Sequence, residues 1–90
     1  MTSRGTDEFW KHYHALPPGL RAAARRAYRK FASNPAHPSL HLERLTSDAR
    51  FWSVRVTTEY RAVAQRLPND AWVWAWIGPH DEFDRIFRRR

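Results

Sequence analysis

The sequence predicts an α+β fold in which two N-terminal helices pack on one face of a four-stranded antiparallel sheet and a short helix ends the chain. Apolar residues recur at helical spacing up to about residue 33, and they alternate with polar residues from about residue 39 to residue 78. Only short turns separate the alternating segments. Parallel strands need long crossover connections, so short turns predict an antiparallel meander.

Two helices are expected before the strands. An apolar stripe predicts a first helix over residues 7–16, and the Pro17-Pro18 pair that follows can end this helix and start the next. The second helix is expected to end at Asn34-Pro35. The opening MTSRGTDEF carries no strand pattern, so no strand is predicted before the first helix. The stripe of the first helix consists of Phe9, Tyr13 and Leu16.

The second helix carries a basic stripe beside its apolar one. Like charges one turn apart repel each other, so these arginines gain nothing from one another. They form either a solvated outer face or a contact face for RNA or an acidic partner. The basic stripe consists of Arg21, Arg25 and Arg29.

Four strands are expected, over residues 39–45, 51–57, 60–67 and 71–78. Strict alternation in the last strand predicts that its three tryptophans share one face of the sheet and that its aliphatic residues share the other. Two helices can cover only one face of the sheet, so the other face should be partly open. The tryptophans are Trp72, Trp74 and Trp76, and the aliphatic residues are Val73, Ala75 and Ile77.

The segment WIGPHDEFDRIF, residues 76–87, joins the last strand to a final helix. Acidic side chains stabilise the positive N-terminal end of a helix and basic side chains stabilise its C-terminal end. The three acids after His80 and the arginines at 85 and 88–90 follow this rule, whereas His80 has no part in it. The acids are Asp81, Glu82 and Asp84.

Composition indicates one small intracellular domain, residues 1–90, with a basic surface. Sixteen Lys and Arg oppose nine Asp and Glu, for a formal charge of +7, and 14 of the 16 are arginine. Arginine binds phosphate through a planar fork and stacks on bases, so this balance points to nucleic acid or to an acidic protein. There is no cysteine, which excludes a disulfide framework, a thiolate zinc site and a cysteine nucleophile. No apolar run reaches the length of a membrane span, so we expect a soluble, cytoplasmic protein.

Arg55 and Arg61 lie among apolar residues of two predicted strands joined by a short turn. A buried charge without a partner is costly, so each arginine either packs on a tryptophan and pairs with an acid such as Glu43 or Glu59, or faces an open groove. In the second case, the two guanidinium groups could form a phosphate clamp on one face of the sheet.

His80 follows the end of the last strand, where functional groups often gather on a rigid sheet. There it could serve as a general acid or base near neutral pH. The other histidines offer no second pair of metal ligands, and a zinc site from His37, His41 and His80 is only a remote alternative. We therefore predict no metal and no cofactor.

Three segments in this order resemble the RelE/ParE superfamily of toxins from type II toxin–antitoxin systems, and they are similar in particular to its RelE, HigB and YafQ-like ribonuclease branch. They are NPAHPSLHLERL, FWSVRVTTEYRAVAQR and WIGPHDEFDRIF, and the resemblance covers about residues 7–87. It implies a toxin that cleaves messenger RNA in the ribosomal A site through the RNA's own 2′-hydroxyl, without a metal.

The resemblance also implies roles for single residues. Arg61 matches the strand arginine that stabilises the charged transition state, Arg55 matches a basic position that binds phosphate, and His80 matches a general acid or base. Phe83 or Phe87 stands where the family has an aromatic that stacks on a base. Tyr60 and Arg85 are expected as further RNA contacts. The chain departs from RelE-type toxins in lacking a predicted N-terminal strand and in having only two lysines.

Two alternatives remain open: a ParE-like inhibitor of DNA gyrase, and a non-catalytic module that only binds an antitoxin. The expected partners are a cognate antitoxin with an acidic and apolar segment, the ribosome and messenger RNA. Operator DNA is expected only through the antitoxin complex, and no membrane contact is expected.

Overall fold

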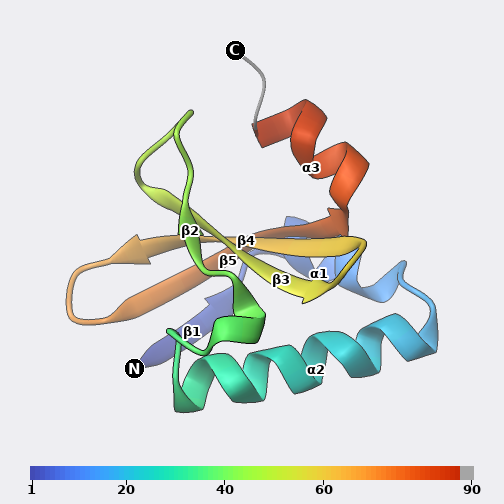
Figure 1. Cartoon of the computed structure of the whole chain (residues 1–90), viewed down its shortest axis with the longest axis horizontal. Helices are drawn as coiled ribbons and strands as arrows, with labels where there is room; N and C mark the ends of the chain where they lie inside the picture. Colours follow the sequence, from blue (N-terminus) through green and yellow to red (C-terminus); the bar gives the residue numbers. More distant parts are fainter. Residues whose placement is uncertain (88–90) are drawn as a thin grey trace.

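The computed structural model describes residues 1–87 (Figure 1). The arginines at 88–90, expected to favour the end of the last helix, lie outside the described residues. The elements in chain order are β1 (Thr2–Gly5), α1 (Asp7–His14), α2 (Pro18–Ser33), the 3₁₀ helix η1 (Pro38–Leu40), β2 (Glu43–Arg44), β3 (Phe51–Thr57), β4 (Tyr60–Leu67), β5 (Ala71–Pro79) and α3 (His80–Phe87).

The sheet of the described chain has five strands in the order β1-β5-β4-β3-β2, so the prediction of four strands was wrong. The antiparallel meander from β2 to β5 is confirmed. The additional strand, β1, pairs in parallel with β5. A short edge strand needs backbone hydrogen bonds but buries few side chains, so Thr2–Gly5 carries no alternating apolar pattern.

The predicted strand at 39–45 is also shorter than expected. Residues Pro38–Leu40 form η1, and only Glu43 and Arg44 pair with β3. Between them, His41 has a left-handed backbone with φ of 45°, which interrupts an extended strand. Beyond Ser53, the outer edge of β3 therefore has no paired strand among residues 1–87.

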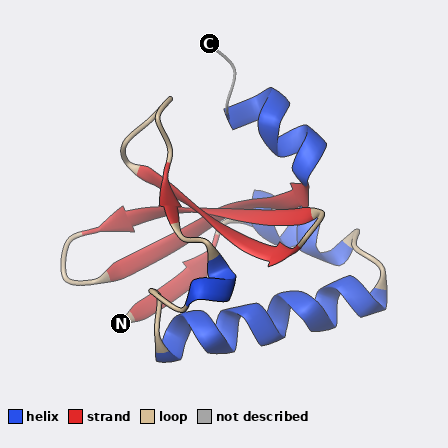
Figure 2. Ribbon diagram, in the orientation of Figure 1, coloured by secondary structure: helices blue, strands red, loops and turns tan. Residues whose placement is uncertain are grey.

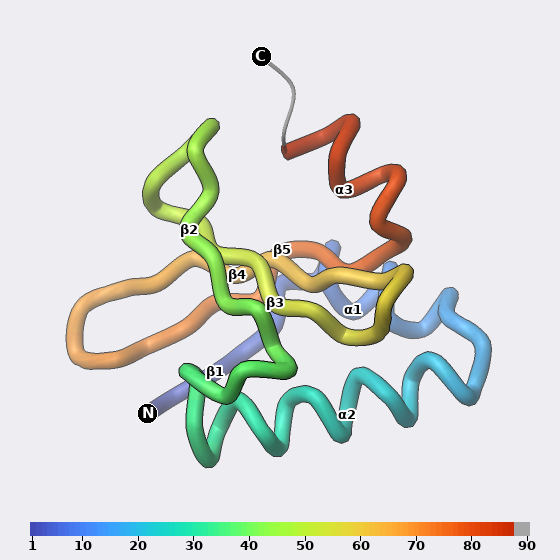
Figure 3. The backbone as a smooth tube through the Cα atoms, in the orientation of Figure 1, coloured from blue at the N-terminus to red at the C-terminus, as the bar shows by residue number. Residues whose placement is uncertain are grey.

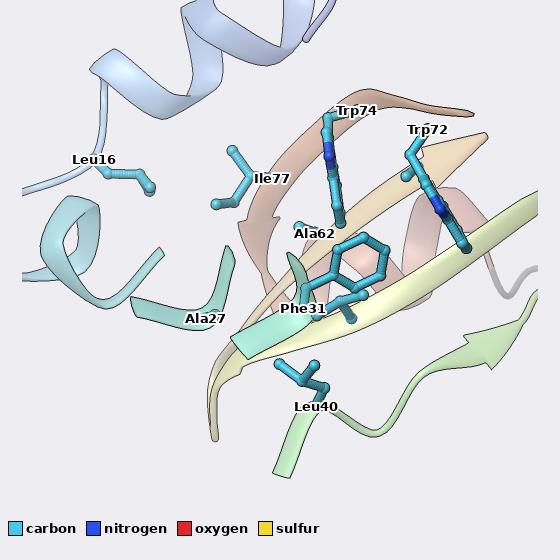
Figure 4. Close-up of a cluster of buried hydrophobic side chains, with 10 residues drawn as sticks. Leu16, Ala27, Phe31, Leu40, Ala62, Trp72, Trp74 and Ile77 are labelled. Atoms are coloured by element: carbon cyan, nitrogen blue, oxygen red, sulfur yellow. The ribbon is translucent and has the colours of Figure 1, made fainter. Parts of the chain in front are cut away.

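Helices α1 and α2 cover one face of the sheet, as predicted, and build the larger core (Figures 1 and 4). Phe31 of α2 is fully buried, and its ring meets Trp72 and Trp74 edge-on at centroid distances of 5.0 and 5.2 Å. Such edge-to-face contacts add to the burial of apolar area. Leu40, Val54 and Ile77 are buried in the same cluster.

Two arginines of the basic stripe bond to the chain before α2 instead of pointing only into solvent, Arg25 to α1 and Arg21 to the connection that follows α1. Arg21 Nη1 donates to the carbonyl oxygen of Leu16 at 2.5 Å, and Arg25 Nη1 donates to the Tyr13 hydroxyl at 2.8 Å. Arg21 and Arg25 therefore also stabilise the packing of α2 against the preceding chain. The two interpretations of the stripe, a solvated face and a contact face, did not include this role.

The opposite face of the sheet is partly covered by α3 (Figure 2). Phe83 is fully buried there in a second cluster with Leu45, Val63 and Trp76. The chain path in Figure 3 brings the start of α3 beside the turn between β3 and β4, where the His80 N–H donates to the carbonyl oxygen of Glu59 at 2.7 Å.

A β-bulge in β5 corrects the prediction for the tryptophans. Val63 pairs with Trp76 but Ala64 pairs with Trp74, so Ala75 is an extra residue in β5. Trp72 and Trp74 therefore face α1 and α2, whereas Trp76 faces α3 and Ile77 lies in the larger core. Strict alternation cannot anticipate one inserted residue.

Among residues 1–87, none of the three α-helices combines the length and the apolar character that crossing a bilayer requires.

Candidate functional site

The paired positions of Arg55 and Arg61 are the centre of the candidate site. They are direct partners in the antiparallel ladder between β3 and β4. Directly opposite residues project to the same face of a sheet, and the alternation with Ser53 and Val63 places this pair on the α3 side. The backbone positions of Arg55 and Arg61 are therefore adjacent, as the clamp hypothesis requires.

Their side chains nevertheless diverge. Arg55 reaches the outer edge of the sheet, where its Nη1 lies 3.1 Å from His41 Nε2. Arg61 turns toward α3, and its Cζ lies 5.6 Å from the centroid of the Phe83 ring. In this conformation the two guanidinium groups do not form the closed clamp that the sequence suggested.

The contact between Arg55 and His41 has one possible direction. A guanidinium has only donors, so Arg55 donates and His41 Nε2 accepts. This assignment leaves Arg55 with a neutral acceptor instead of a carboxylate. A charged acceptor such as a phosphate would make a stronger bond with the same guanidinium.

Arg61 is half-buried beneath α3, and its Nε and Nη1 atoms have no exposed surface. A cation over an aromatic ring in such a partly desolvated place is attracted more strongly than at the surface. The low local dielectric also strengthens its interaction with any negative charge that forms nearby. A negative charge that formed beside Arg61 would therefore interact with it more strongly than at the protein surface.

His80 begins α3 and is held by two contacts. Its backbone N–H is bound to Glu59, and its Nδ1 lies 3.1 Å from Asp84 Oδ2, one helical turn further on. An N–H at Nδ1 can donate to Asp84 Oδ2, and Nε2 is then the ring nitrogen available as an acceptor. The His80 ring also lies 6.1 Å from the Phe83 ring, so His80 and Arg61 contact the same aromatic side chain.

The four predicted RNA contacts lie in different places. Phe83 is 0% exposed, so its ring is part of the core and offers no face to a base in this conformation. Phe87 is half-buried at the rim of the same cluster, and Arg85 is exposed. Tyr60 packs against the larger core on the opposite face from Arg61. Phe87 and Arg85 are therefore the two that remain accessible on the α3 side.

Trp76 and Gly78 belong to the site although the sequence suggested no role for them. Gly78 is the ladder partner of Arg61, and a Cβ at Gly78 would lie 2.6 Å from Trp76 Cζ2. The Trp76 indole therefore lies over Gly78 and packs on the sheet beside Arg61. An aromatic two residues before a glycine in a strand is the signal that could have revealed this packing.

His41 was likewise not predicted to contact Arg55. Its position depends on a left-handed residue at the end of η1, a conformation that histidine adopts less readily than glycine. No sequence pattern indicates it. Among residues 1–87, no three histidine or acidic side chains are grouped closely enough to hold a metal ion.

Comparison with solved structures gives the same fold in several toxins. The YoeB/ParE toxin from Agrobacterium tumefaciens is 21% identical, with a TM-score of 0.72 over 89% of this chain and 99% of that one. YafQ from E. coli is 10% identical, with a TM-score of 0.73 over 90% and 94%. The RelB–RelE antitoxin–toxin complex from Methanococcus jannaschii has a chain 13% identical, with a TM-score of 0.70 over 91% and 96%.

A search of curated protein sequences gave no significant match. The family profile described as the ParE-like toxin domain matches residues 18–85, from the start of α2 to within α3. This range contains β3, β4, β5 and the three residues at the centre of the site. Because the profile spans most of the chain, the chain belongs to the family of ParE-like toxin domains.

Proposed function

We propose that this toxin is an endoribonuclease that cleaves messenger RNA on the ribosome and so stops translation. One observation carries the proposal: a half-buried arginine, Arg61, and a histidine oriented by a carboxylate, His80, lie against the same ring, Phe83. Cleavage of RNA requires a cation for the charged phosphorus centre and a group that accepts a proton.

In the proposed reaction, the RNA 2′-oxygen attacks the adjacent phosphorus while His80 Nε2 takes the hydroxyl proton. Arg61 stabilises the negative charge of the pentacoordinate phosphorane. The bond from phosphorus to the 5′-oxygen then breaks, and this oxygen takes a proton from solvent. The products are a 2′,3′-cyclic phosphate and a 5′-hydroxyl, and this route requires no metal. Asp84 acts as a positioning residue that balances the imidazolium.

Arg55 is proposed to bind the substrate phosphate after leaving His41. Its bond to a neutral imidazole is weaker than a bond to a phosphate oxygen, so a bound strand would compete for it. Phe87 and Arg85 are proposed to contact the RNA at the exposed rim of the same side. Because the substrate is translated mRNA, the toxin would act in the cytoplasm.

The test is expression of the toxin without an antitoxin, followed by primer extension on cellular transcripts. Wild type is expected to give in-frame cuts and to stop translation. Arg61→Ala is expected to remove the cuts while remaining folded and soluble. Blocked DNA supercoiling with intact transcripts would instead identify a gyrase-directed toxin, and intact transcripts with normal supercoiling would leave an antitoxin-binding module.

A cognate antitoxin is proposed to cover the cavity between α1 and α2. The cavity has a volume of about 470 Å³, and Trp10 and Tyr28 at its rim are 45% and 42% exposed. Exposed aromatic side chains around a concavity mark interaction surfaces. Arg25 and Arg29 on the same rim suit a partner segment that is acidic as well as apolar. Operator DNA would be reached only through this antitoxin.

A further inference from the structure

A second, polar groove lies between α2 and the outer edge of β3 and adjoins the aromatic cavity at Ala27 and Val56. Its volume is about 340 Å³. It is lined by residues from α2, from η1 and from the end of β3 with the following turn: Ala23, Arg26, Ala27, Lys30, Ser39, Leu40, Arg55, Val56, Thr57 and Thr58.

The α2 wall of the groove combines small and basic residues at helical spacing. Ala23 and Ala27 are one turn apart and leave room for a ligand to approach the helix. Arg26 and Lys30 are also one turn apart, and both are exposed. Lys30 Nζ lies 3.4 Å from Ser39 Oγ, so its ammonium group is directed toward η1.

The opposite wall is built from the unpaired edge of β3. The two residues of β2 pair only with Trp52 and Ser53, so no strand of residues 1–87 pairs with this edge from Arg55 onward. Arg55 reaches this edge through its contact with His41. The left-handed backbone of His41 is the kind of strain that clusters at functional sites.

The charges around the groove are not balanced. Three cations line it and no carboxylate does. Within residues 1–87, no Asp or Glu forms an ion pair with Arg26, Lys30 or Arg55. Three like charges around one concavity repel each other, and a bound anion would relieve that repulsion.

We propose that this groove binds the phosphate backbone of a single-stranded RNA outside the cleavage site. Arg26 and Lys30 would neutralise a phosphate on the α2 side, and Arg55 would connect the groove to the candidate site on β4. Threonine and serine hydroxyls beside the cations suit phosphate and sugar oxygens. An acidic protein segment would also need apolar anchors, and these are concentrated in the other cavity. Naming the strand as RNA rests on the proposed function.

The test measures binding without cleavage. The probe is a fluorescent 2′-O-methyl RNA of roughly 12 nucleotides, which cannot be cut because it has no free 2′-hydroxyl. Titrations at several salt concentrations compare the purified wild-type chain with the double variant R26Q/K30Q. The matched control R44Q/R66Q removes the same charge from two exposed arginines that lie over Trp52.

R26Q/K30Q is expected to weaken RNA binding about tenfold. The slope of log affinity against log salt concentration should become shallower by about 0.7 for each lost phosphate contact. R44Q/R66Q should change affinity by no more than about twofold. Amide shifts at Thr57 and Thr58 should move in the wild-type chain as RNA is added. Unchanged binding by R26Q/K30Q, an equal loss in R44Q/R66Q, or static shifts at Thr57 and Thr58 would overturn the proposal.

A competing peptide of glutamates distinguishes the chemistry of the ligand. It should displace the RNA only weakly, and displacement at equal charge concentration would show that the groove recognises carboxylates instead. Because the probe is not cleaved and the exchanged residues lie outside the cleavage site, failure here leaves the proposed ribonuclease activity untouched. The ribonuclease activity is tested independently, by primer extension with Arg61→Ala.

Discussion

At the scale of single residues, His80 and Arg61 owe their placement to contacts made by other parts of the chain. Asp84 orients one nitrogen of His80, and the histidine and Arg61 both lie near the ring of Phe83. Neither side chain is fixed by its own strand or turn alone. The proposed chemistry therefore depends on α3 being packed against the sheet.

Replacing His80 by glutamine tests its proposed role as the proton acceptor. Loss of a positioned base costs roughly 100- to 10,000-fold in rate, so His80→Gln should reduce mRNA cleavage by that order. Cleavage on purified ribosomes under single-turnover conditions measures the effect, with Glu82→Gln on the same helix as the control. Cleavage at the wild-type rate would mean that His80 has only a structural role at the N-terminus of α3.

Asp48 has the lowered pKa of a carboxylate held by an arginine. The Arg50 side chain, through hydrogen bonds at 2.7 and 3.0 Å, lowers the pKa of Asp48 from 3.8 to about 2. A depressed folded-state pKa contributes stability that is present above the unfolded value and lost as pH falls through the folded one. The loop before β3 should therefore loosen between about pH 4 and pH 2.

An NMR titration of the Asp48 carboxyl group checks this pair. The midpoint should lie near pH 2 in wild type and should return toward 3.8 in Arg50→Gln. Identical midpoints in the two proteins would show that the ion pair does not form in solution.

At the scale of elements, the bulge in β5 decides what lies on each face of the sheet. Without the extra residue at Ala75, Trp76 would face α1 and α2 with the other tryptophans. With it, Trp76 lies over Gly78 and packs against Phe83 and Phe87 of α3. The insertion of Ala75 thus places the Trp76 ring on the face of the sheet that holds the candidate site.

Two glycine-to-alanine exchanges should have opposite effects on stability. At Gly78 a new Cβ would overlap Trp76 and force the indole to shift, so Gly78→Ala should destabilise the fold by about 1–3 kcal/mol. At Gly19 in α2 nothing lies within 4 Å, and Gly19→Ala should stabilise it by up to roughly 1 kcal/mol. Urea unfolding of both variants provides the measurement. A neutral Gly78→Ala would argue that Trp76 is not packed over the strand.

At the scale of the whole molecule, the sheet separates two surfaces of different character. The α1 and α2 side presents an aromatic cavity, and the α3 side holds Arg61 and His80. Arg55 lies at the edge between them and lines the polar groove. An antitoxin in the aromatic cavity and RNA bound beside Arg61 and His80 would thus contact opposite faces of the sheet.

Tyr28→Glu should weaken antitoxin binding because it places a charge in the aromatic rim against an acidic segment. An exposed aromatic that a partner buries in an interface often contributes about 2 kcal/mol or more, and an antitoxin in the cavity would cover Tyr28. Calorimetry with the antitoxin encoded beside the toxin gene measures the loss, and Arg66→Gln at a distant exposed site is the control. Equal affinities for wild type and Tyr28→Glu would move the antitoxin site elsewhere.

The sequence by itself determined the two N-terminal helices, three of the four strands of the meander and the placement of Arg55 and Arg61 on two strands joined by a short turn, whereas the register of the structure makes the two arginines direct partners. These features are local, because periodicity and short turns fix helices, strands and hairpin pairs between neighbours in the chain. The tertiary structure alone decided that Thr2–Gly5 forms a fifth strand, that a bulge turns Trp76 toward α3, and that His41 contacts Arg55. Each of these depends on segments that are distant in the chain or on one irregular backbone residue. Phe83 shows the difference, since the family resemblance suggested an aromatic that stacks on a base, whereas packing against Val63 and Trp76 makes Phe83 part of the core.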